Sequence, residues 1–119
     1  MGLKKDIEAG ITAIHYGLFE QAVECLSRAI KTGKADDEAY YFRGMAHSAI
    51  GDMDRAIQDY TRALEIRPGV TEIHFLRAVC WENKGDCEKA IVDAQAALDL
   101  DPEDEACQCY IEQIRARLV

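Results

Sequence analysis

The sequence of 119 residues has only two prolines and no apolar stretch long enough to cross a bilayer. Its eight glycines are spread thinly, and this balance favours helices over a turn-rich β fold. Positive charge is also scarce, because 14 Lys and Arg stand against 22 Asp and Glu and leave a net charge of -8. An acidic surface repels phosphates and anionic lipid headgroups, so we expect neither nucleic acid nor membrane as a partner. A basic partner would be attracted, although acidity also serves solubility alone.

The five cysteines lack the pairing pattern of a secreted disulfide framework. Their number is odd and no CxxC spacing occurs. The lysines that follow the first methionine are not succeeded by an apolar segment, so no signal peptide is expected. We therefore expect a reducing, cytoplasmic compartment, a view that would stay open if the chain is a module of a larger protein.

A seven-residue segment recurs at a spacing of 34 residues. Gly51–Ile57 (GDMDRAI) returns as Gly85–Ile91 (GDCEKAI) and, more weakly, as Gly17–Val23 (GLFEQAV). The same spacing separates several other residues, namely Ala22, Ala56 and Ala90, then Ala29, Ala63 and Ala97, and also Pro68 and Pro102. Three aligned copies without a gap indicate an internal repeat.

Each repeat unit is predicted to contain two helices. In the second unit the first helix runs from about Glu38 to Ile50, with Asp36 or Asp37 as its N-cap and Gly51 as a left-handed C-cap. Asp52 can cap the next helix, and Pro68 ends it. In the third unit we expect helices over about 72–84 and 88–100. Small residues at equivalent places in the first helices should let the two helices of a unit approach closely; these are Gly10, Gly44 and Ala78.

The second unit carries an aromatic residue, a glycine, two alanines and a late proline in a characteristic order, namely Tyr40, Gly44, Gly51, Ala56, Tyr60, Ala63 and Pro68. This pattern resembles the tetratricopeptide repeat. The resemblance covers residues 3–104 as three repeats, 3–36, 37–70 and 71–104, within one domain of residues 1–119. It implies an all-α, right-handed α-solenoid of three helix-turn-helix units. The second repeat matches best, whereas the third has Ala94 in place of Tyr60 and the first has Leu26 there.

A seventh helix is predicted over residues 105–119. Its apolar residues recur at spacings of four, three and four and therefore share one face, which consists of Cys107, Ile111, Ile114 and Leu118. An open solenoid end exposes apolar surface, so we expect this helix to cap it. The alternative is that the helix docks on a partner or on a second copy of the chain.

Two repeats carry an arginine on the first helix and an aspartate on the second, Arg43 with Asp59 and Arg77 with Asp93. The first repeat has Ala9 and Cys25 at these places and lacks both charges. Joint presence and joint absence predict two partly buried ion pairs with a structural role.

In the tetratricopeptide family the first helices line a concave groove that holds an extended peptide or a helix. The corresponding residues here, which we call the candidate groove residues, are Ile7, Ile11, Ile14, Glu38, Tyr41, Met45, Glu72, Phe75, Val79 and Glu82. Their apolar stripe predicts an apolar or amphipathic partner segment, and the glutamates favour basic residues beside it. The alternative is that the stripe is ordinary packing between neighbouring first helices.

One subgroup of the family grips the C-terminal carboxylate of chaperones with lysines, asparagines and an arginine. The corresponding residues here cannot do so, since they are Ile7, Ile11, Phe42, Glu72 and Leu76. We therefore exclude chaperone-tail binding of that type.

No pattern for catalysis, a metal or a cofactor stands out. The three histidines, His15, His47 and His74, are scattered, and Cys107 and Cys109 would point apart on a helix. Cys80, Cys87 and His74 lack the usual zinc-ligand spacing. Two functions remain: a module that binds a partner protein, or a self-associating scaffold that uses the groove or the last helix. The first corresponds to a monomer and the second to a homo-oligomer.

Overall fold

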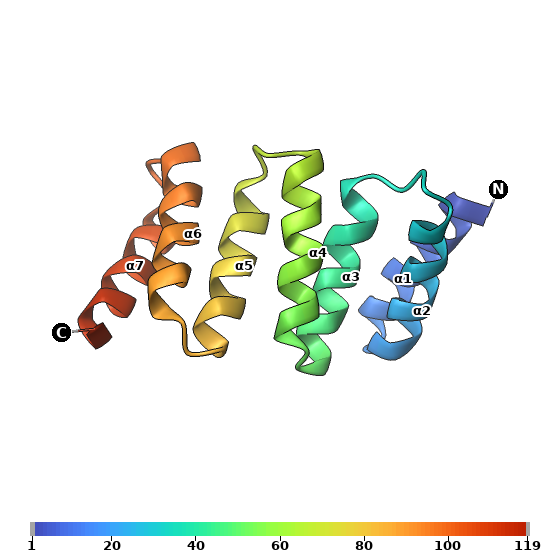
Figure 1. Ribbon diagram of the computed structural model, residues 1–119, viewed down its shortest axis with the longest axis horizontal. Coiled ribbons are helices and arrows are strands. Elements are labelled where there is room, and N and C mark those ends of the chain that lie inside the picture. Colours follow the sequence, from blue (N-terminus) through green and yellow to red (C-terminus); the bar gives the residue numbers. More distant parts are fainter. Residues whose placement is uncertain (1, 119) are drawn as a thin grey trace.

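The computed structural model describes residues 2–118, and within them all regular structure is helical. The helices follow one another along an elongated body of 50 × 25 × 21 Å, with α1 and α7 at its opposite ends (Figure 1). None of the described helices is long and apolar enough to span a membrane. The bounds are α1 Gly2–His15, α2 Phe19–Lys31, α3 Asp37–Ile50, α4 Met53–Ile66, α5 Thr71–Asn83, α6 Cys87–Leu100 and α7 Glu105–Leu118.

The helix ends follow the capping residues in the sequence. The Asp36 side chain accepts a hydrogen bond from the backbone N–H of Glu38, so Asp36 rather than Asp37 is the N-cap of α3. Gly51 ends α3 in the left-handed region with φ 100°, and Asp52 then caps α4. Leu18 stands at the equivalent place before α2 and makes no side-chain cap. The predicted bounds in the second and third units differ from the observed ones by one residue, and Val119 lies outside the described residues.

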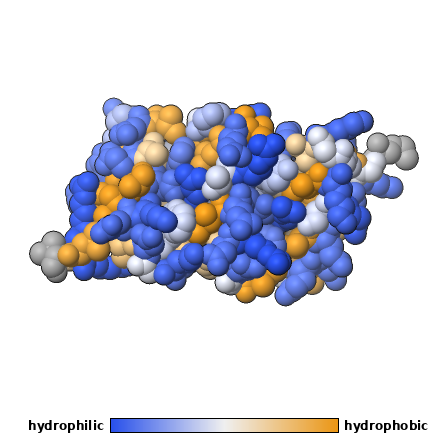
Figure 2. Space-filling model, in the orientation of Figure 1, coloured by the Kyte–Doolittle hydropathy of each residue, from blue (hydrophilic) through white to orange (hydrophobic). Residues whose placement is uncertain are grey.

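The helices pair as three hairpins, α1–α2, α3–α4 and α5–α6, and each second helix also packs on the first helix of the next unit. In Figure 1, α2 lies in front of α1 and α4 in front of α3. This face is largely hydrophilic, with hydrophobic residues scattered between polar ones (Figure 2). The central hairpin has a core built around Tyr60, whereas the third hairpin has a core of alanines that α7 completes with Cys107, Ile111 and Ile114.

The small residues on the first helices do permit a close approach, but to a side chain rather than to a backbone. A Cβ atom at Gly44 would lie 2.7 Å from the Tyr60 ring, and one at Gly10 would lie 2.6 Å from Leu26. In the third repeat the opposite residue is Ala94, which leaves room for the methyl group of Ala78; both residues are fully buried. The size of one residue therefore compensates for the size of the other.

Helix α7 buries most of the face that its periodicity predicts. Cys107, Ile111 and Ile114 are buried against α6 and its neighbours. The prediction is wrong for Leu118, which is 51% exposed. This side chain lies beside the α5–α6 turn at residues 84–88, where the exposed residues are Lys84, Gly85 and Glu88.

Candidate functional site

The candidate groove residues lie on α1, α3 and α5, the first helices of the three hairpins. All seven apolar members are half-buried, which leaves part of each side chain accessible. Four of them also pack against the core clusters, namely Ile14, Tyr41, Met45 and Phe75. The other three, Ile7, Ile11 and Val79, lie outside those clusters. Four residues of the stripe therefore take part in helix packing, and all seven keep part of their side chains accessible.

Tyr41 and Glu72 connect α3 with α5. The Tyr41 hydroxyl donates a 2.8 Å hydrogen bond to Oε1 of Glu72. Burial and this bond raise the pKa of Tyr41 to about 12, so the hydroxyl keeps its proton at neutral pH. Glu72 remains exposed and accepts this bond through only one of its carboxylate oxygens.

Glu82 is already occupied by α7. The Tyr110 hydroxyl donates to it at 2.9 Å, and Arg117 forms an ion pair with its other oxygen. The Arg117 guanidinium holds the pKa of the Glu82 carboxyl below its usual range. The charge of Glu82 is therefore compensated within the chain. Sequence reasoning missed Tyr110 and Arg117, although their spacing of seven residues places them on one face of α7.

Helix α7 also contacts the α5 end of the candidate surface through an aromatic pair. The rings of Phe75 and Tyr110 have centroids 5.0 Å apart and planes tilted by 59°. Such tilted contacts between aromatic rings are favourable beyond the area they bury. Helix α7 thus fixes the side chains of two candidate groove residues on α5, Phe75 and Glu82. Its buried face is not free to dock on another molecule.

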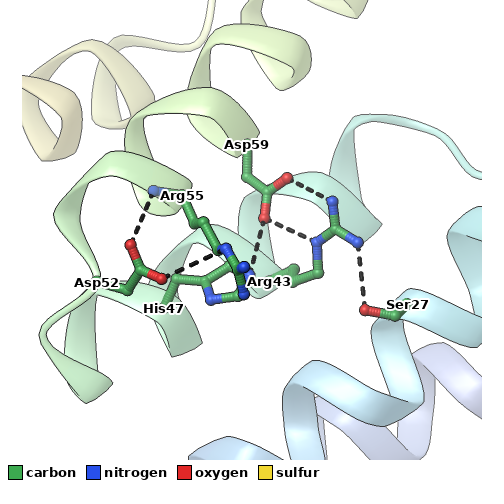
Figure 3. Close-up of polar contacts among 6 residues, drawn as sticks. All are labelled: Ser27, Arg43, His47, Asp52, Arg55 and Asp59. Carbon is green, nitrogen blue, oxygen red and sulfur yellow. Dashed lines mark hydrogen bonds and ion pairs between the residues drawn. The ribbon is translucent and has the colours of Figure 1, made fainter.

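Both predicted ion pairs are present, and the first is drawn in Figure 3. Nε and Nη2 of Arg43 donate to the two carboxylate oxygens of Asp59 at 2.8 and 2.7 Å. Asp59 is only 4% exposed. A third donor, Nη1 of Arg43, reaches Oγ of Ser27 on α2 at 3.2 Å. One arginine therefore connects three helices, α2, α3 and α4.

The second pair repeats this geometry one unit later. Arg77 donates to Asp93 at 2.8 and 2.6 Å and to Oγ1 of Thr61 on α4 at 3.0 Å. Each arginine thus bonds back to the second helix of the preceding repeat. In the first repeat Ala9 stands at the arginine position, so this bond has no counterpart there. Sequence reasoning missed this third contact of each arginine, although the hydroxyl residues Ser27 and Thr61 stand 34 positions apart and could have indicated it.

A polar recess of about 240 Å³ lies beside the first pair. Arg43 is neutralised there by Asp59, and Nε of Arg55 lies 3.5 Å from Asp52, so the recess carries no unbalanced charge. Burial lowers the pKa of His47, which keeps the imidazole neutral although Asp59 lies 3.8 Å away. The lining residues are Ser27, Arg43, His47, Arg55, Gln58 and Asp59.

The cysteines and histidines do not assemble into a site. Within residues 2–118, no group of three or more His, Cys, Asp or Glu side chains is placed to hold a metal ion. All five cysteines are free thiols. Burial raises the pKa of Cys80 and Cys107, so both thiols stay protonated at neutral pH and serve the core.

A stack of paired helices with a 34-residue repeat defines a helical repeat protein. The tetratricopeptide-repeat family model matches residues 37–70, which are the second repeat including its hairpin α3–α4. The second repeat therefore matches the tetratricopeptide-repeat family, and the described residues form an all-helical solenoid. No curated protein matches its sequence significantly.

Solved structures share this fold over almost the entire chain. MamA superposes with a TM-score of 0.91 at 21% identity, over 94% of this chain and 66% of that protein. The second such domain of human RPAP3, in complex with the HSP70 peptide SGPTIEEVD, gives 0.89 at 23% identity, over 97% and 96% of the two chains. The Yersinia enterocolitica chaperone SycD, in complex with a YopD peptide, gives 0.91 at 18% identity, over 98% and 95%.

Proposed function

We propose that this chain is a protein-interaction module, and that the candidate groove residues bind an apolar or amphipathic segment of a partner protein. The observation that carries this proposal is the row of half-buried apolar side chains on α1, α3 and α5, of which Ile7, Ile11 and Val79 lie outside the core clusters. A partner segment laid over them would gain roughly 1.5–3 kcal/mol for each large side chain fully buried, before ordering costs.

The solved relatives with bound peptides support a binding role over a catalytic one. The RPAP3 domain and SycD were both solved with a peptide from another protein. In this chain the net charge of -8 favours basic residues in the partner segment. The five free thiols fit a reducing compartment such as the cytoplasm.

The ligand is expected to differ from that of the RPAP3 domain, whose peptide ends in two glutamates, a valine and an aspartate. An acidic chain end would meet Glu72 here, together with four residues that carry no charge, Ile7, Ile11, Phe42 and Leu76. We expect no measurable binding when the peptide SGPTIEEVD is titrated into the protein. Binding at micromolar concentration would contradict this expectation.

The proposal is tested by charging the groove residues that lie outside the core. The double substitution Ile11→Lys, Val79→Lys should abolish capture of partner proteins from a native lysate, because two charges would have to be buried under the bound segment. Val92→Lys is the matched control, since Val92 is 69% exposed on α6 and belongs to no candidate site. Captured proteins are compared by mass spectrometry, and thermal unfolding checks that both variants fold. Equal capture by both variants would refute the groove assignment.

Self-association through the groove is the second candidate function. The last helix does not favour it, because Cys107, Ile111 and Ile114 are already buried within the chain. Light scattering after size exclusion separates the two candidates. A monomer over the working concentration range supports the interaction module, whereas a stable dimer that Ile11→Lys, Val79→Lys dissociates supports the scaffold.

A further inference from the structure

Two depressions lie on either side of Glu72, near the N-terminal ends of α3, α5 and α7. The first, of about 230 Å³, lies between α3 and α5 and has Tyr41, Phe42 and Ile73 among its lining residues. The second, of about 370 Å³, lies between α5 and α7 and is mostly apolar, with Phe75 and Ala106 in its lining. Glu72 lines both depressions and therefore lies on the boundary between them.

The charged side chains that line these depressions are all acidic. The lining contains the carboxylates of Asp37, Glu38, Glu72 and Asp104 and no lysine or arginine. Asp37 lies 3.6 Å from Arg67 and Asp104 caps α7 through the backbone N–H of Cys107, so these two already have partners. The carboxylate of Glu38 and one carboxylate oxygen of Glu72 have no protein hydrogen-bond or ion-pair partner within residues 2–118.

A bound cation would complete the hydrogen bonding of Glu72. The Tyr41 hydroxyl already holds one of its oxygens at 2.8 Å, which orders the carboxylate before any ligand arrives. An ordered acceptor loses less side-chain entropy on binding than a free one. An ammonium or guanidinium group can donate to the second oxygen, whereas an acidic or purely apolar residue at this place would leave it unsatisfied.

We propose that the partner segment presents a lysine or arginine to Glu72, flanked on each side by an apolar residue that enters one of the two depressions. This inference rests on the proposed function, because it specifies the register of a segment bound on the same surface. The two depressions favour apolar residues on either side of the central position, because these side chains are buried there. The carboxylates of Glu72 and Glu38 favour a cationic residue at the central position.

A peptide-display selection tests the proposal and separates it from the proposed function. Random twelve-residue peptides are selected on the immobilised protein and counter-selected on the Ile11→Lys, Val79→Lys variant. We expect peptides that need the native surface and are enriched in Lys or Arg between two large apolar residues. One contrary outcome is that the selected peptides bind the native protein and not the variant, yet lack Lys or Arg between the two apolar residues or carry Asp or Glu at that position. That result would overturn the proposed register and leave the proposed function standing. The absence of any peptide that distinguishes the two proteins overturns both proposals.

A charge-removal experiment then assigns the cation to Glu72. The best selected peptide should bind Glu72→Gln about three- to tenfold more weakly at low salt, with the difference shrinking toward 1 M salt because the interaction is exposed to screening. The glutamine oxygen can still accept from Tyr41, so the orientation of the side chain is retained. Glu24→Gln, with the same charge change on an exposed part of α2, is the control.

A second peptide, with norleucine in place of the central Lys or Arg, completes a double-mutant cycle between the peptide and Glu72. This peptide should bind the native protein and Glu72→Gln equally, since neither complex can then form the ion pair. If the norleucine peptide loses as much affinity from Glu72→Gln as the cationic peptide does, Glu72 acts through the shape of the surface and the assignment of the cation fails.

Discussion

At the scale of single residues, the distance between the two helices of a hairpin depends on one matched pair of side chains. Gly44 faces the ring of Tyr60, and Ala78 stands at the equivalent place opposite Ala94. Because Tyr60 is only 1% exposed, its ring cannot swing away to make room. The second hairpin therefore packs a glycine against a large side chain, whereas the third places two alanines opposite each other.

Gly44→Ala should destabilise the protein even though alanine is the better helix former. Overpacking against Tyr60 costs roughly 1–3 kcal/mol, and the gain in helix propensity offsets about 1 kcal/mol of it. Urea unfolding should therefore show a net loss of about 1 kcal/mol. In a Tyr60→Ala background the same change should be stabilising, because only the propensity gain remains. An equal stabilisation in both backgrounds would contradict the close approach.

At the scale of the helices, the ion pairs hold each first helix to its own hairpin partner and to the preceding unit. Arg43 bonds Asp59 on α4 and Ser27 on α2, so breaking the pair loosens two interfaces at once. Both partners are partly or fully removed from water, with Asp59 the more deeply buried. The cost of an unpaired charge should therefore exceed the net contribution of the pair itself.

A double-mutant cycle tests this pair. Arg43→Leu leaves Asp59 buried without its cation and should cost about 3–5 kcal/mol of unfolding free energy. The double substitution Arg43→Leu, Asp59→Leu should cost less than that single change. The exposed pair of Arg28 and Asp6, 3.4 Å apart, is the control and should show little coupling. Additive losses at positions 43 and 59 would count against a coupled pair.

The helices were largely predictable from the sequence, since capping residues and apolar periodicity act within a few neighbouring positions. Gly51, Asp52 and Pro68 placed the ends of α3 and α4 to within one residue or so. The candidate site was less predictable. Glu82 was expected to face a basic partner, yet it is paired by Arg117, 35 residues away, and that contact depends on how α7 packs against α5.

At the scale of the whole molecule, a solenoid is stabilised by contacts between neighbouring repeats, and its two described ends differ. The C-terminal end is closed by α7, which completes the alanine core of the third hairpin. The first hairpin lacks the buried Arg–Asp pair of the other two hairpins and has no side-chain cap at Leu18, and its buried residues in the smallest core cluster are two alanines, Ala13 and Ala22. Stability should therefore be uneven along the chain.

Native-state hydrogen exchange should reveal this gradient. Amides in α1 and α2 should exchange at lower free energies of opening than those in α3–α6, where the buried pairs and the Tyr60 core lie. Ser27→Ala should increase exchange in α2 and α3 more than in α6, since it removes the bond from Arg43 to the first repeat. Uniform protection across all helices would show that the chain unfolds as one cooperative unit instead.

The sequence by itself determined the repeat, its paired helices and the pairing of Arg43 with Asp59, because each follows from spacings that recur every 34 residues, and it determined the last helix through its apolar periodicity. The tertiary structure alone decided that Leu118 stays exposed, that Glu82 is neutralised by α7, and that Glu72 lies between two hollows. The physical reason is that periodicity specifies which face of a helix is apolar. The residues that meet across helices depend on how those helices pack, so only the assembled solenoid shows which charges remain for a partner.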